Sequence, residues 1–137
     1  MEWIWQKAPR ICCGSCSATK DRRKEERPNR TPLFRLSTAL PEFAAEARRT
    51  LIKCGETELA KQVDELWIYD RCRCGGKECA TIYTSTGEEP PSGRRGTGGH
   101  LPDAKGYVLI DVCNEHVVCI EIPCYPEFVK ALAELVP

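Results

Sequence analysis

The sequence predicts an α+β domain, in which a four-stranded antiparallel sheet of two hairpins carries helices packed on one face. Three observations support this fold. Two segments with helical spacing of apolar residues come first, two pairs of strand-like segments follow, and one more helical segment ends the chain. Within each pair of strand-like segments the connection is short, which favours antiparallel neighbours. The chain has 137 residues, 42% of them hydrophobic, and this suits one domain with a modest core.

The helices are predicted from apolar periodicity and from signals at their ends. Pro41 occupies a position that the first turn of a helix tolerates, and Gly55 suits the cap at the end of the same helix. The apolar face between them consists of Phe43, Ala44, Ala47 and Leu51. A second, shorter helix has an inner face formed by Leu59, Ala60 and Val63. The last helix opens at Pro126, and its apolar stripe is Phe128, Val129, Leu132, Leu135 and Val136.

The strands are predicted from their composition. The first hairpin pairs residues 66–71 with residues 80–84, and the second pairs residues 107–112 with residues 117–122. Apolar residues fall on both faces of the second hairpin, so its strands are expected in the middle of the sheet. The stretch 85–105 is rich in glycine and proline and is predicted to be a long loop between the hairpins.

Charge divides the chain into two parts. Residues 1–35 hold nine Lys and Arg against four Asp and Glu, whereas residues 36–137 hold eleven against sixteen. The first part is predicted to be a basic, disordered arm that offers a contact for nucleic acid, and the second a single α+β domain. No apolar run approaches the ~20 residues that span a membrane, and the start lacks the pattern of a signal peptide. The expected location is therefore the cytoplasm.

Three cysteines, Cys72, Cys74 and Cys79, lie close together in the first hairpin. The alternation of side chains along strands places all three on one face near the turn. They are candidate zinc ligands, with His100 as the best local fourth ligand, although the spacing differs from that of common zinc sites. Reduced thiols packed in the core, or a redox pair of Cys74 and Cys79, are the alternatives.

A second candidate site is the glycine-rich segment around Arg94 and Arg95. Backbone amides of glycines can approach an anion, and the two guanidinium groups add positive charge, so this segment is a candidate for anion or nucleic-acid contact. It lacks the pattern of a phosphate-binding P-loop. A plain connection between the hairpins is the alternative.

Residues 40–136 resemble a family of small bacterial proteins of unknown function. The features that carry the resemblance are Leu40-Pro41 at a helix start and the segments 70–75, 79–81 and 109–112. The resemblance implies a bacterial, cytoplasmic source and brings no established activity with it.

Catalytic residue patterns are scarce, since the chain has only two histidines and no recognisable nucleophile motif. We therefore expect a non-enzymatic protein-interaction module with a protein partner. An immunity- or antitoxin-like role, in which an acidic surface covers a basic site, is one version of this hypothesis. The alternatives are a small protein with structural zinc at the cysteine hairpin, and a thiol redox sensor.

Overall fold

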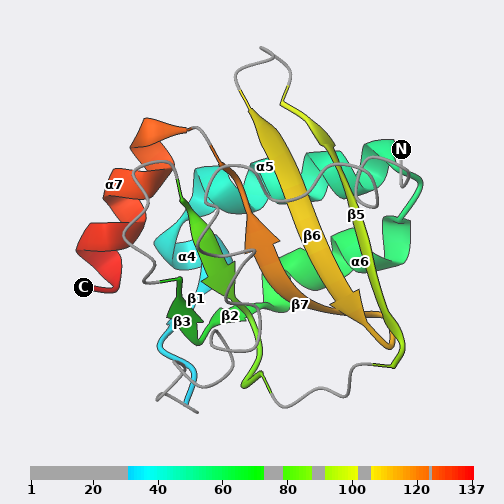
Figure 1. Ribbon diagram of the computed structural model, residues 1–137, viewed down its shortest axis with the longest axis horizontal. Helices are drawn as coiled ribbons and strands as arrows, with labels where there is room; N and C mark the ends of the chain where they lie inside the picture. The colour runs from blue at the N-terminus through cyan, green and yellow to red at the C-terminus, as the bar shows by residue number, and fades with distance from the viewer. Residues whose placement is uncertain (1–30, 73–78, 88–91, 102–105, 124) are drawn as a thin grey trace.

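The computed structural model describes residues 31–72, 79–87, 92–101, 106–123 and 125–137. This part of the chain combines helices with antiparallel sheets, which confirms the α+β class (Figure 1). The helical elements are α4 (Leu36–Ala39), α5 (Pro41–Lys53), α6 (Thr57–Gln62), the 3-10 turn η1 (Val63–Glu65) and α7 (Pro126–Leu135). The strands are β1 (Phe34–Arg35), β2 (Trp67–Ile68), β3 (Asp70–Arg71), β4 (Thr81–Tyr83), β5 (Arg94–His100), β6 (Tyr107–Cys113) and β7 (His116–Glu121).

The prediction of one four-stranded sheet is wrong. The described strands form a five-stranded sheet in the order β3-β4-β7-β6-β5 and a separate two-stranded sheet of β1 and β2. Two causes explain the difference, namely an additional strand in the predicted loop and the division of one predicted strand between the two sheets.

The additional strand is β5, which lies inside the glycine-rich stretch that was predicted to be a loop. It pairs with β6 along its whole length, from Arg94 opposite Cys113 to His100 opposite Tyr107. Glycine weakens a strand unless another part of the backbone approaches closely. At Gly98 this approach is evident, because an added Cβ would lie 2.2 Å from the carbonyl oxygen of Val108. Strand pairing and close packing therefore form β5 against its local propensity.

The divided strand is the predicted segment 66–71. Its first half, β2, pairs with β1, so that Phe34 lies opposite Ile68. Its second half, β3, pairs with β4, so that Asp70 lies opposite Tyr83. The two residues of β1 belong to the predicted arm 1–35, whose residues 1–30 lie outside the described part of the chain.

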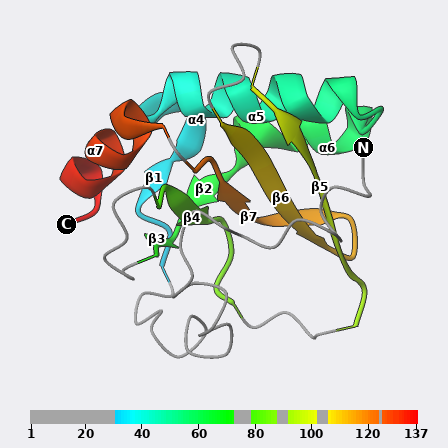
Figure 2. The ribbon, with the colours of Figure 1, turned by 45° about the horizontal axis from the view of Figure 1, so that its top comes forward.

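The predicted helices are present and pack against one face of the larger sheet. Figure 1 shows α5 and α6 behind the strands and Figure 2 shows them above the sheet, with α7 next to the N-terminal end of α5 in both views. Apolar residues of these helices share one core with alternate residues of the central strands, including Ile82, Ile110 and Ile120. The rings of Phe43 and Phe128 meet edge to face with their centroids 5.2 Å apart and connect α5 to α7. As predicted, Gly55 ends α5, with a left-handed φ of 77°.

The opposite face of the sheet has a different composition. A smaller buried cluster there consists of Cys72, Tyr83, Cys113, Val118 and Cys119. The register also places Asp70 opposite Tyr83, and Asp111 opposite Cys119, on this same face. One face of the sheet is therefore aliphatic, whereas the other carries thiols and carboxylates.

Candidate interaction surface

Three of the four exposed large apolar side chains in the described part of the chain lie in or next to the β1–β2 ribbon. Leu33 is 41% exposed, and Phe34 and Trp67 are each 38% exposed. Phe34 lies opposite the buried Ile68 and shares its side of the ribbon, whereas Leu33 and Trp67 alternate with these residues onto the other side. We call Leu33 and Trp67 the apolar patch. The fourth such side chain, Ile52, is 54% exposed but lies apart on α5. Scattered single apolar residues are normal on a protein surface, whereas a group of them is a sign of an interaction site.

The two-stranded sheet explains why the patch faces outward. Ile68 is buried in the main core, so its neighbour Trp67 points to the other side of the ribbon. Arg35, opposite Trp67, has its guanidinium carbon 4.9 Å from the centre of the indole ring. An Arg35 Nη1 donor also bonds the carbonyl oxygen of Asp64 at 3.2 Å. This cation–π contact and this hydrogen bond hold Trp67 and Arg35 in a defined orientation.

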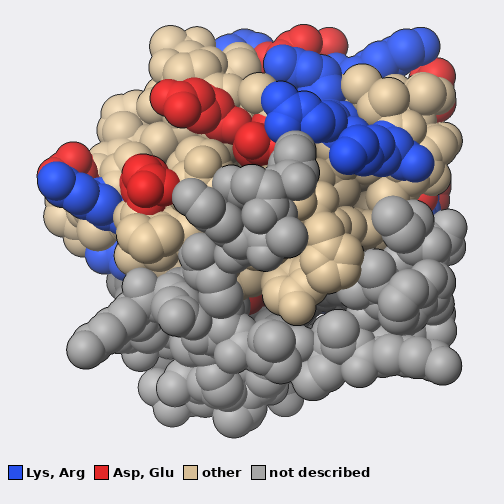
Figure 3. Space-filling view, turned by 90° about the horizontal axis from the view of Figure 1, so that it is seen from above, with Lys and Arg blue, Asp and Glu red and all other residues tan. Residues whose placement is uncertain are grey.

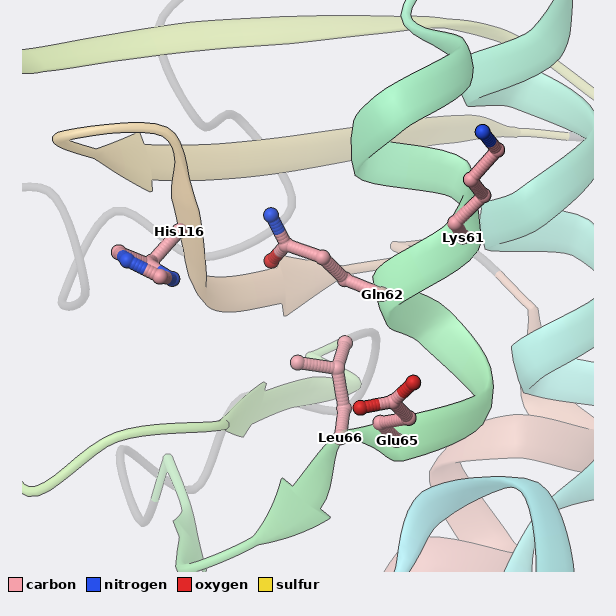
Figure 4. Close-up of a pocket in the computed structure, with 5 residues that line it drawn as sticks. All are labelled: Lys61, Gln62, Glu65, Leu66 and His116. Carbon is pink, nitrogen blue, oxygen red and sulfur yellow. The ribbon is translucent and has the colours of Figure 1, made fainter.

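A hollow of about 340 Å³ lies between the end of α6 and the β6–β7 hairpin, and one of its lining residues, Leu66, directly precedes Trp67 of the patch. Figure 4 shows its lining, with the Gln62 side chain extended toward the hairpin and the Lys61 ammonium directed away from His116. A neighbouring hollow of about 350 Å³ shares three lining residues, namely Gln62, Leu66 and His116. The hollows and the patch therefore adjoin along the chain.

The β6–β7 hairpin lines both hollows, with His116 in each of them and the turn residue Asn114 in the larger one. Asn114 and Glu115 both have left-handed backbone angles, with φ of 50° and 64°, as in the tight turns that match the twist of a hairpin. Gln62 binds this turn twice. Its Nε2 donates to the carbonyl oxygen of Glu115 at 2.6 Å, and its Oε1 accepts from the Val117 amide at 3.1 Å.

Arg95 binds the same turn from β5. Its guanidinium donates to the Glu56 carboxylate at 2.6 and 3.1 Å and to the Glu115 carboxylate at 3.0 and 3.2 Å. The hydrogen bonds to Glu56, and to a smaller extent those to Glu115, raise the pKa of Arg95 above its usual value. The Arg95 guanidinium in turn lowers the pKa of the Glu115 carboxyl. Arg95 therefore connects the edge strand, the start of α6 and the hairpin turn.

This arrangement bears directly on the predicted anion site. Arg95 already binds two carboxylates, and the glycines that follow it lie in the β5–β6 ladder. Arg94, the other predicted residue, is exposed at the start of β5. The contact of Arg94 and Arg95 with an anion or nucleic acid stays a prediction, and the geometry around Arg95 gives it no support.

The predicted metal ligands do not all come together. Cys72 and Cys79 pack in the same buried cluster, and Cys74 lies outside the described residues. His100 ends β5, at the opposite edge of the sheet from β3 and Cys72. With about 4.8 Å between neighbouring strands, the two edges are roughly 19 Å apart. Among the described residues, no group of three or more His, Cys, Asp or Glu side chains is arranged to hold a metal ion.

The three buried carboxylates were not predicted to share one face of the sheet. Asp70 and Glu121 are each 1% exposed and Asp111 is 9% exposed, and all three lie on the thiol-bearing face of the sheet. Buried carboxylates need compensating partners. Their common face depends on the register of β3, β6 and β7, a long-range property that no local sequence signal reports.

Comparison with known proteins gives no relative for this chain. No family model, no curated protein and no solved structure matches it. Each helix in the described part of the chain is too short or too polar to traverse a lipid bilayer.

Proposed function

We propose that this chain is a protein-interaction module that binds its partner through the apolar patch of Leu33 and Trp67. The exposure of these two side chains on one side of the β1–β2 ribbon is the observation that carries the proposal. Tryptophan and arginine are the residue types that most often dominate the binding energy of an interface. Here Arg35 stacks on Trp67, so both are already ordered before a partner arrives. Prior order lowers the entropic cost of binding.

The charges of the described surface bear on the kind of partner. Figure 3 shows one face on which Lys and Arg side chains form a large group, with Asp and Glu side chains flanking it. Close to the patch, the Asp64 carboxylate is paired with Arg48 at 2.8 Å, and the Asp64 carbonyl oxygen accepts a hydrogen bond from Arg35. Charges of both signs therefore lie next to the patch. This pattern favours an apolar contact over the acidic surface that an immunity- or antitoxin-like role requires.

An affinity-capture experiment with matched variants tests the proposal. The full chain, a Leu33→Ser/Trp67→Ser double variant and an Ile52→Ser control are immobilised and exposed to a lysate of the source cells. We expect one protein to be retained in stoichiometric amount by the wild type and by the control, and to be lost from the patch variant. All the altered side chains are exposed, so unchanged thermal melting can verify that the fold is intact.

Two outcomes would contradict the proposal. One is equal retention of the partner by the patch variant, which would place the interface elsewhere. The other is the absence of any protein retained in stoichiometric amount.

The structural-zinc hypothesis remains an alternative because Cys72 and Cys79 share one cluster. Elemental analysis of the full chain, purified without a histidine tag, tests it directly. One zinc ion per chain, together with a lower melting temperature in a chelator, would support this function. A metal-free protein with unchanged melting would remove it.

A further inference from the structure

The turn of the β6–β7 hairpin is strained and at the same time held in place. Glycine is the residue favoured at the second left-handed position of such a turn, but here that position is Glu115 with φ of 64°. A residue with a side chain is unfavourable in this conformation. This unfavourable conformation favours a different shape of the turn, so contacts from outside the hairpin must stabilise the observed one.

Those contacts come from two side chains on different elements. Gln62 of α6 holds the backbone of the turn at Glu115 and at Val117. Arg95 of β5 holds the Glu115 carboxylate and is itself anchored by Glu56, whose side chain is only 17% exposed. We call Gln62 and Arg95 the clasp.

A buried thiol directly precedes the turn and belongs to the cluster on the face of the sheet opposite the helices. Cys113, the last residue of β6, lines the hollow of about 350 Å³ together with His116 and is only 3% exposed. Its Sγ lies 3.8 Å from the carbonyl oxygen of Ser92, which it can reach as a weak donor. Because Cys113 directly precedes the turn, displacement of the turn would also move Cys113 out of its cluster, widen this hollow and bring solvent to the thiol.

We propose that the clasp controls access to the hollow, so that release of Gln62 and Arg95 lets the strained turn swing away and exposes Cys113. This inference does not depend on the proposed interaction function, because it concerns only the coupling between the turn and the hollow. The Glu115 side chain is 72% exposed, so salt in the solution can weaken its ion pair with Arg95. The ion pair between Arg95 and Glu56 is less exposed, so it holds Arg95 more strongly.

Alkylation of the folded, reduced full chain by iodoacetamide tests the proposal, with the modified peptides quantified by mass spectrometry. When closing is faster than labelling, the labelling rate follows the population of the open state. Loss of charge-assisted hydrogen bonds in Arg95→Ala should raise the labelling rate of Cys113 by about tenfold or more. Cys119, buried on the central strand β7, should keep its rate, since local opening does not reach it.

Two further variants complete the design. Glu115→Gln removes the charge from the exposed ion pair with Arg95 and leaves the Arg95–Glu56 pair intact. It should therefore produce a smaller increase in the labelling rate of Cys113 in a chain that folds normally. Arg49→Ala, which removes an exposed ion pair with Glu46 on α5, is the matched control and should change nothing. Unchanged labelling of Cys113 in both clasp variants would overturn the proposal. So would equal acceleration at Cys113 and Cys119, since this means that the whole domain unfolds.

Discussion

Gly98 offers the sharpest test of how the glycine-rich segment is used. In the structure, the Cβ that alanine would add lies 2.2 Å from the carbonyl oxygen of Val108 and 3.3 Å from the Cα of Leu109. Both atoms belong to the backbone of β6, so no side-chain rotation can relieve the contact. The edge strand β5 must move away from β6, and its hydrogen bonds to β6 must weaken. The Cys54 thiol, whose Sγ lies 3.3 Å from the Gly98 carbonyl oxygen, must also shift.

The expected cost of Gly98→Ala can be assembled from these effects. Overpacking in a tight site costs about 1–3 kcal/mol. Each weakened backbone hydrogen bond adds about 0.5–1.5 kcal/mol. We therefore expect a loss of about 2–4 kcal/mol in the free energy of unfolding, a large share of the ~5–15 kcal/mol that stabilises a typical domain. Urea denaturation followed by tryptophan fluorescence measures this loss.

Gly55→Ala is the matched control for Gly98→Ala. Gly55 has φ of 77° but no atom within 4 Å of an added Cβ, so only backbone strain of about 1 kcal/mol is expected. If Gly98→Ala is as stable as the wild type, the reasoning about close strand packing is refuted. A loss of anion binding without a loss of stability would restore the interpretation of this segment as an anion-binding loop.

The remaining predictions concern pH and the core. Arg95 lowers the pKa of Glu115 below its usual 4.5, so the ionised carboxylate stabilises the fold above this pH and the benefit is lost as the pH falls below it. Denaturation between pH 6 and 3 should therefore show a steeper loss for the wild type than for Glu115→Gln, and parallel curves would contradict the ion pair. Leu51 is fully buried, so Leu51→Ala should cost about 2–5 kcal/mol in urea denaturation. Its exposed neighbour should tolerate Ile52→Ala within about 0.5 kcal/mol, and similar losses in the two variants would contradict the orientation of α5.

The predictable parts of this fold are those that local signals determine. The helix α5 was predicted because apolar residues recur on one face and because Pro41 and Gly55 mark its ends. The strands β6 and β7 have the composition of central strands, and their hairpin was placed to within one residue at each end of the turn.

The parts that were not predicted depend on long-range pairing. No local rule favours a strand at Gly96–Gly99, because the strand is stabilised by its partner β6 and not by its own propensity. The apolar patch was also missed, because a strand pattern shows that Trp67 alternates with its neighbours but not which side meets the core. The separation of His100 from Cys72 follows from the strand order, which the sequence does not reveal.

The passage of one segment through both sheets has a mechanical consequence. Between β2 and β3 lies only Tyr69, whose amide donates to the Tyr83 carbonyl oxygen at 2.8 Å. A force applied to the β1–β2 ribbon is therefore transmitted to the edge of the larger sheet through a single residue, with no flexible linker between the two sheets. Any molecule that grips the ribbon should slow amide exchange at Tyr69 as well as in the ribbon. This position would then report an event at the surface from inside the main sheet.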